Sequence, residues 1–105
     1  MFCINPNSHT ITITRGDTAC FEVKLNGYEP SEGDELVMTI KRRKEDAASQ
    51  AVMTKKAEDM IFCFAPDETT DLLGRYHYDI QLTTAAGAVY TPIVSAITFE
   101  RGVTE

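Results

Sequence analysis

The chain lacks the features that define several large classes of protein. Its 105 residues contain no tryptophan and only two histidines, and no apolar run approaches the ~20 residues that a membrane-spanning helix needs. The first residues, 1–6, have neither a basic region nor an apolar core, so we expect no signal peptide. From these absences we expect a chain that is made and kept in a cytoplasm.

Positive charge is scarce. The chain has 10 Lys and Arg against 16 Asp and Glu, a net charge of −6, which disfavours general binding to nucleic acid or anionic membranes. The only basic cluster, residues 41–44, runs directly into Glu45 and Asp46, as is typical of a solvated hairpin tip. We therefore expect neither nucleic acid nor membrane as a partner.

Cysteine is too rare and too widely spaced for a disulfide framework or a zinc site. The chain has an odd number of cysteines, Cys3, Cys20 and Cys63, and no two of them form a C-x-x-C pair. A bridge between Cys20 and Cys63 is geometrically conceivable if their strands are neighbours. Because a reducing compartment keeps thiols reduced, the sequence favours three free cysteines that serve as small apolar residues.

Motifs that support catalysis are also missing. The chain has no G-x-S-x-G turn, no phosphate-binding glycine loop and no redox dithiol. His77, between Arg75 and Asp79, is better interpreted as a solvated or cross-strand-paired side chain than as part of a hydrolase site. We expect no enzymatic activity and no cofactor.

Two acidic groups and one tripeptide are better explained as surface and turn residues than as binding sites. The acidic groups lack the D-x-[DN]-x-[DN]-G spacing of a calcium loop, so we expect no metal site. They are Glu32/Asp34/Glu35 and Asp67/Glu68/Asp71. The tripeptide Arg15–Asp17 resembles an integrin-binding motif, but Gly-Asp is ordinary turn chemistry between two strands.

What the sequence does contain is strand alternation, seen best in residues 73–82. Tyr76, Tyr78, Ile80 and Leu82 would point to one face of a strand. The residues between them, Arg75, His77, Asp79 and Gln81, would point to the other face. We expect the first set to face a core and the second to form a polar outer surface.

Seven such segments, separated by turn residues, predict an all-β protein. They are residues 9–14, 18–25, 35–42, 50–56, 59–65 and 73–83, and a last strand that returns after Gly87 and ends at Phe99. Residues 43–49 are expected to form a long hairpin loop or one helical turn. The apolar run 60–64 cannot be phased from sequence and is compatible with a strand covered on both faces.

Seven strands in about a hundred residues are typical of an immunoglobulin-like sandwich of two antiparallel sheets. We expect one domain, residues 1–105, with an ordered core over 9–100, polar termini and a short helical turn at the corner before residue 74. Tyr76 is the candidate for a tyrosine corner, with its hydroxyl bonded to main chain near Thr70 or Asp71. Alternatively, Tyr76 and Tyr78 are both simply core aromatics.

Several residues are predicted to have structural roles. Phe21 and Ile40 are expected in the core, Gly74 ends the helical turn, and Gly87 takes a left-handed bulge position. Pro92 is expected to mark an edge or a switch between sheets. The threonine-rich segment 9–14 and the region around Pro92 are candidate edges.

Two parts of the chain together resemble a known family. Residues 11–18 with 21–23, and Gly33-Asp34 leading into Leu36, are similar to the opening of small tail-associated proteins of Gram-positive phages and prophages. The run from Pro66-x-Glu68-Thr69 through residues 74–83 to Gly87 and Val89 is similar to that family's second half. The resemblance covers roughly residues 10–104 and includes the immunoglobulin-like N-terminal domain of the phage baseplate upper protein. Here Glu68 stands where that family has Asp.

The resemblance implies a non-enzymatic virion component that docks onto other tail or baseplate subunits. It favours an adaptor or decoration protein with tail proteins as partners, and self-association through edge strands. Two other classes remain open: an immunoglobulin-like adhesion or carbohydrate-binding module, which needs exposed aromatics such as Tyr28 and Tyr90, and a sandwich-type protease inhibitor with a rigid protruding loop.

Overall fold

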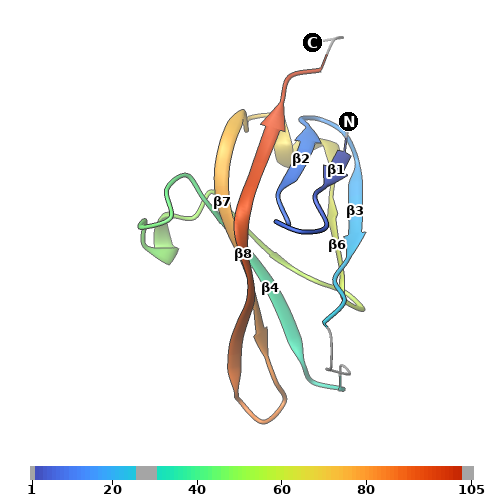
Figure 1. The fold of residues 1–105 in the computed structure, drawn as a ribbon, viewed down its shortest axis with the longest axis vertical. Coiled ribbons are helices and arrows are strands. Elements are labelled where there is room, and N and C mark those ends of the chain that lie inside the picture. The colour runs from blue at the N-terminus through green and yellow to red at the C-terminus, as the bar shows by residue number, and fades with distance from the viewer. Residues whose placement is uncertain (1, 26–30, 103–105) are drawn as a thin grey trace.

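The fold is a sandwich of two β-sheets, seen in a computed structural model that describes residues 2–25 and 31–102 (Figure 1). The strands within these ranges are β1 (Phe2–Ile4), β2 (Ile11–Thr14), β3 (Ala19–Glu22), β4 (Glu35–Lys41), β5 (Met53–Lys56), β6 (Ile61–Phe64), β7 (Gly74–Thr83) and β8 (Val89–Glu100). Two short helical turns complete them, the 3₁₀ turn η1 (Ala48–Gln50) and α1 (Pro66–Thr69).

The larger sheet has six strands in the order β1-β2-β8-β7-β4-β5, and the smaller sheet pairs β3 with β6. The prediction of a two-sheet all-β sandwich is therefore confirmed. The expectation of antiparallel pairing throughout is wrong at one place, because β2 runs parallel to β8. The structure also contains β1, which the sequence pattern did not predict and which pairs with the outer edge of β2.

Alternation along β7 places its tyrosines as predicted. Tyr76, Tyr78, Ile80 and Leu82 are buried, and the residues between them lie on the outer face of the six-stranded sheet. Across the sandwich, Phe62 and Phe64 of β6 are fully buried. The Phe99 ring joins the two layers, since it makes edge contacts with Phe64 at 6.4 Å and with Tyr76 at 5.6 Å between ring centroids.

The remaining predicted core residues also face inward. Ile40 is fully buried, and Phe21 is half-buried between the rings of Phe2, Phe62 and Phe64. The apolar run in β6 is covered on one face only, because Ile61 and Cys63 are exposed. The predicted second strand ends earlier than expected, at Glu22, and the loop predicted at residues 26–30 lies outside the described residues.

The turns follow the glycine chemistry of the sequence. Gly87 has a φ of 93° and closes the Thr84–Gly87 turn of the β7–β8 hairpin through its N–H to the Thr84 carbonyl. Gly74, at a φ of 97°, ends the corner and begins β7. The predicted helical turn at this corner is α1, which has Pro66 at its first position.

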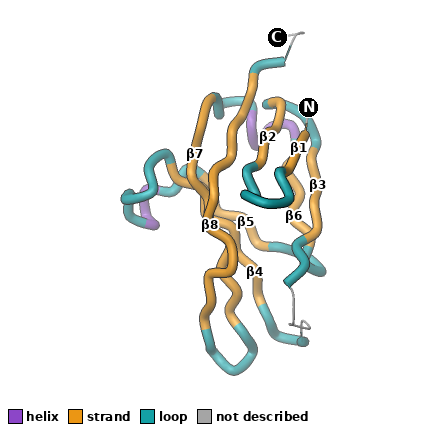
Figure 2. The backbone as a smooth tube through the Cα atoms, in the orientation of Figure 1, coloured by secondary structure: helices purple, strands orange, loops and turns teal. Residues whose placement is uncertain are grey.

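The long connection between β4 and β5 is a hairpin loop that includes η1, so both forms expected for it occur. Figure 2 shows it projecting from the side of the sheets. Strand β5 pairs with β4, in the six-stranded sheet, and so leaves β3 and β6 as a two-stranded layer.

We expect Ile40→Ala to lower the free energy of unfolding by about 2 to 5 kcal/mol, because it removes three carbon atoms from a site with 0% exposure and leaves a cavity. Urea unfolding followed by circular dichroism measures the change. Leu73→Ala, at a side chain that is 43% exposed, is the matched control and should cost less than about 0.5 kcal/mol. Equal losses in the two variants would contradict the assignment of Ile40 to the core.

Candidate interaction surface

The outer face of the six-stranded sheet gathers the ionisable residues of β4 and β7. Lys41 of β4 lies opposite His77 of β7, and Thr39 lies opposite Asp79. On the far side of β7, Asp79 faces Val94 of β8. The predicted polar outer surface is therefore present, and pairing between strands supplies the neighbours that strand alternation alone could not.

A shallow hollow of about 170 Å³ lies on this face, over the adjacent strands β4, β7 and β8. Its lining includes Thr39, Lys41, Lys44, His77, Asp79 and Val94. Within the described residues, the side chains of Lys41, His77 and Asp79 make no hydrogen bond or ion pair. Of the two expectations for His77, solvated or paired across strands, the structure places it opposite Lys41 with no bond between the two side chains.

The first half of β8 is an open sheet edge. Strand β2 pairs with β8 only from Ile97 onward, so among the described residues the segment 89–94 has a neighbouring strand on one side alone. The edge predicted around Pro92 is confirmed, and Pro92 lies where the pairing shifts register between Ile80 and Leu82. The prediction that residues 9–14 form another edge is wrong, because β1 pairs with β2 there.

This open edge also exposes large apolar side chains. Val89, Tyr90 and Val94 are 55%, 59% and 55% exposed. On the inner side of the hairpin, Tyr90 and Pro92 line a hollow of about 440 Å³ together with Leu25 and Ile93. The hairpin tip lies at the end of the molecule opposite the C-terminus (Figure 1).

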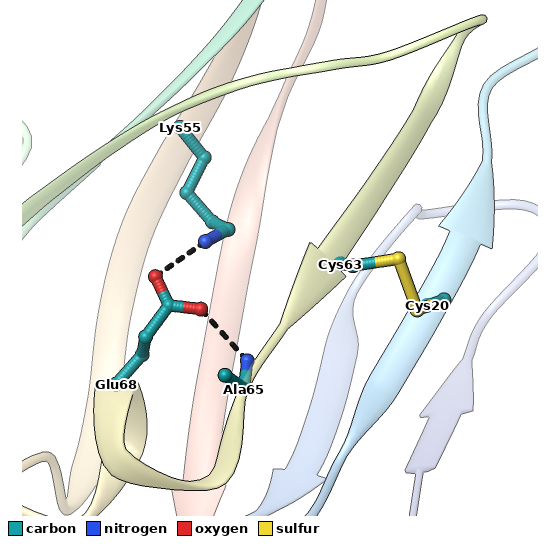
Figure 3. Close-up of a disulfide and its surroundings, with 5 residues drawn as sticks. All are labelled: Cys20, Lys55, Cys63, Ala65 and Glu68. Atoms are coloured by element: carbon teal, nitrogen blue, oxygen red, sulfur yellow. Dashed lines mark hydrogen bonds and ion pairs between the residues drawn. A yellow bond between two sulfur atoms is a disulfide. The ribbon is translucent and has the colours of Figure 1, made fainter.

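The two-stranded sheet is closed covalently, contrary to the expectation of three free thiols. Cys20 and Cys63 lie directly opposite each other on β3 and β6 and form a disulfide on the exposed face (Figure 3). Cys3 is the free cysteine of the described residues and is exposed. The sequence argument failed because it weighed compartment and cysteine number, whereas the register of β3 on β6 decides the pairing.

Glu68 ties the corner together, although the sequence argument placed it only in a solvated acidic group. One carboxylate oxygen accepts the Ala65 N–H at 2.7 Å, and the other binds the Lys55 ammonium at 2.5 Å (Figure 3). The Ala65 N–H first, and the Lys55 ammonium second, hold the pKa of this carboxyl below its ordinary value. Lys55 also lies 5.3 Å above the Phe64 ring, so Glu68 connects α1 to both sheets.

The tyrosine corner predicted at Tyr76 is wrong. The Tyr76 hydroxyl accepts a hydrogen bond from Arg42 at 3.3 Å, and the Arg42 guanidinium lies over its ring. It is Tyr78 that reaches the main chain, donating to the His9 carbonyl at 2.5 Å. Burial raises the pKa of Tyr78 to about 12, so its phenol stays a hydrogen-bond donor over the physiological range.

The Arg15–Asp17 segment is a tight turn held against the corner. The Gly16 N–H donates to the hydroxyl of Thr69 at 2.8 Å, and Thr69 is fully buried. The Asp17 N–H closes the turn onto the Thr14 carbonyl. The turn role expected for this tripeptide is the one the structure supports.

Part of each acidic group is engaged in internal contacts, since Glu68 of the second group binds Lys55 and Ala65. Asp34 accepts the N–H groups of Ser31 and Ala85, which braces two loops, and Glu35 pairs with Lys56 at 2.8 Å. Among the described residues, no three His, Cys, Asp or Glu side chains gather as metal ligands would. No helix in this part of the chain is both long and apolar enough to cross a membrane.

Comparison of the chain with protein-family models, curated proteins and solved structures finds no significant match.

We expect the double variant Cys20→Ser/Cys63→Ser to lose about 4 kcal/mol of unfolding free energy, because the bridge closes a loop with a sequence separation of 43. Guanidinium unfolding with and without a thiol reductant measures this loss, and the reductant should no longer affect the double variant. Cys3→Ser is the control and should unfold like the parent. A parent whose midpoint does not respond to reductant would contradict the bridge.

We expect Glu68→Gln to flatten the acid side of the stability curve. Since the folded-state pKa of Glu68 is below the ordinary value of a glutamate, the stabilising contribution of this carboxylate is present above that ordinary value and is lost as the pH falls through the folded-state pKa. Urea unfolding between about pH 3 and about pH 7 measures the slope. Glu58→Gln, at an exposed side chain of the same charge, should keep the parent slope.

Proposed function

We propose that this chain is a non-enzymatic structural or accessory protein of a phage or prophage, which acts as a tail or baseplate adaptor or decoration through contacts with other proteins. The proposal takes its class from the resemblance of residues 11–23 and 66–89 to small phage tail proteins. Its partners are other virion subunits, and the chain is made in the host cytoplasm before assembly.

One observation carries the protein-binding role: the open edge of β8. Within residues 2–25 and 31–102, no strand pairs with this side of residues 89–94, which also carry three exposed apolar side chains, Val89, Tyr90 and Val94. Natural proteins usually protect such edges with charge, and residues 83–99 contain none. Pro92 and the bulge beside it limit uncontrolled strand addition, so the edge is suited to a shaped partner.

The strand arrangement supports the finer, immunoglobulin-like assignment. Such sandwiches place their second and fifth strands in one sheet and their third, sixth and seventh strands in the other. With β2 as the first of seven strands, β3 and β6 take the former places, and β4, β7 and β8 take the latter. Strand β5, next to β4, has the position of the extra strand in variable-type domains.

An adhesion or carbohydrate-binding role is the alternative, and it requires several exposed aromatic side chains close together. Tyr90 is one such side chain. Tyr28, which the sequence argument also considered, lies outside the described residues. The open edge of β8 therefore favours protein contact over sugar stacking.

We expect the protein to co-sediment with virions at a fixed stoichiometry when its host strain is induced and the particles are purified on a density gradient. The double variant Val89→Lys/Tyr90→Lys should reduce incorporation about tenfold or more, because it places charge on the apolar edge. Quantitative mass spectrometry of the particle fraction gives the readout.

The control is Val52→Lys, at a 38% exposed side chain remote from the hairpin, which should incorporate like the parent. Thermal unfolding of all three proteins separates a lost contact from a lost fold. A protein that stays entirely in the particle-free fraction of an induced culture would contradict the virion role.

A further inference from the structure

The open edge of β8 directs its backbone groups outward at two residues, Val89 and Val94. In the β7–β8 hairpin, the Thr84 N–H donates to the Ala88 carbonyl at 2.8 Å. Bonded and non-bonded pairs alternate along an antiparallel ladder, so the next pair, Thr83 and Val89, has no backbone bond between its members. The N–H and carbonyl of Val89 therefore point away from β7.

The orientation of Val94 follows from the other end of the strand. The Arg15 N–H donates to the Glu100 carbonyl at 2.8 Å, so Glu100 faces the side of β2. Every second residue of a strand faces the same side, and β8 keeps a continuous register on β7 from Ile93 to Phe99. The N–H and carbonyl of Val94 therefore point to the same side as those of Glu100, beyond the end of β2.

The irregularity at Pro92 brings these two outward residues into phase. Val89 and Val94 are five positions apart, and in a regular strand such residues would face opposite sides. The register shift between Ile80 and Leu82 removes this difference. Both valine side chains also lie on the outer face of the sheet, and each is 55% exposed. The two ends of the open edge therefore match each other.

We propose that a second copy of this chain pairs with the open edge of β8 as an antiparallel strand, in the register that sets Val89 opposite the partner's Val94. A twofold axis between positions 91 and 92 relates the copies and repeats this pair. Each pair exchanges two backbone hydrogen bonds, because all of its groups point outward. Pro92 lies next to the axis, so its missing N–H removes no bond between the valines. The inference rests on the proposed function and names the partner at the same edge.

The same register matches apolar side chains on both faces. On the outer face, each valine meets a valine of the partner. On the inner face, the hairpin extends beyond β3 and β6 and leaves Tyr90 59% exposed (Figure 1). Tyr90 lies opposite the partner's Ile93 in this register, and Ile93 lines the hollow of about 440 Å³ together with Leu25 and Pro92. The contact therefore covers the apolar side chains that a single chain exposes at this edge.

The charge distribution favours a second copy over an unrelated subunit. An isologous contact brings residues close to copies of themselves, so a charged residue within it would repel its own counterpart. Residues 83–99 contain no charged side chain, in a chain with 10 basic and 16 acidic residues. A strand from an unrelated protein also fits unpaired backbone groups, but it requires neither this neutral stretch nor the matched ends.

The nearest charges lie outside the contact. On the outer face, Asp79 is across from Val94 on β7, three strand spacings, or about 14 Å, from the partner's β7. In the hollow, the charged residue is Lys24, which follows β3 in the other layer of the sandwich. Neither charge lies on the paired strands.

The first test compares two double variants of the full chain by sedimentation velocity between about 10 µM and about 1 mM. We expect the parent to form a dimer as its concentration rises. Val89→Lys/Val94→Lys sets like charges opposite each other and should raise the dissociation constant of the dimer about tenfold or more. Val89→Glu/Val94→Lys sets opposite charges there and should stay within about threefold of the parent.

The second test fixes the register and does not depend on the charged variants being folded. In a Cys3→Ser background, ¹⁵N-labelled Val89→Cys is mixed with unlabelled Val94→Cys and oxidised with glutathione disulfide. Mass spectrometry should find dimers of one labelled and one unlabelled chain, because bonded pairs place Cα atoms about 5.5 Å apart. Each variant oxidised alone is the control, because its cysteine lies about five residues, or about 16 Å, along the strand from its own copy.

A parent that stays monomeric at about 1 mM would overturn the proposal, and so would a dimer that the two double variants weaken equally or not at all. Cross-linked dimers of two labelled chains that form as readily as mixed ones would also overturn it, because they would place the contact in another register.

Failure of this pairing is distinguishable from failure of the proposed function. If the parent is monomeric and Val89→Lys/Val94→Lys still loses incorporation into virions, the second copy is wrong and the virion role stands with a different subunit at the edge. If the parent dimerises in this register but never enters a particle, the virion role fails and the paired edge stands.

Discussion

The central strand β7 is the constraint on which the rest of the structure depends. It pairs with β8 over nearly its whole length and with β4 over residues 77–83, so its register determines which side chains of three strands face the core. A slip of one residue would exchange Tyr76 and Tyr78 for His77 and Asp79 on the inner face. The free energy of burying two tyrosines rather than two ionisable groups enforces the observed register.

From that register, the two faces of the sheet acquire different roles. The inner face meets the phenylalanines of β6 and is closed by the contacts of Phe99 and Glu68. The outer face keeps charged groups whose bonds are not made within the described chain. Stability is therefore concentrated between the sheets.

The sequence predicts local features of this protein well and long-range ones poorly. The alternation in β7, the left-handed Gly87 and the helical turn at Pro66 are set by residues within a few positions of one another. The pairing of β5 with β4, the covering strand β1 and the disulfide depend on which distant segments become neighbours. The alternation of apolar and polar residues carries no information about which strands become neighbours. The sequence therefore allowed a bridge between Cys20 and Cys63 but could not distinguish it from free thiols.

The tyrosine corner illustrates the same limit at a single atom. Tyr76 and Tyr78 both lie inward, as alternation requires, and differ only in what each hydroxyl meets. The Tyr78 hydroxyl reaches the His9 carbonyl because the loop before β2 passes close to it. The Tyr76 hydroxyl instead reaches Arg42, the residue that follows β4. Which tyrosine bonds to main chain follows from where these two connections run, and that is decided by the topology of the sandwich.

Fold alone does not assign function, because immunoglobulin-like and related sandwiches support many kinds of binding. What distinguishes this chain is where its unpaired groups are. The second sheet has only two strands, yet its outward cysteines are joined to each other, while Lys41, His77 and Asp79 on the larger sheet have no side-chain partner among the described residues. Since a half-buried charge that has no partner in the fold adds no pairing energy, the stability of the sandwich comes from its inner face and not from these groups.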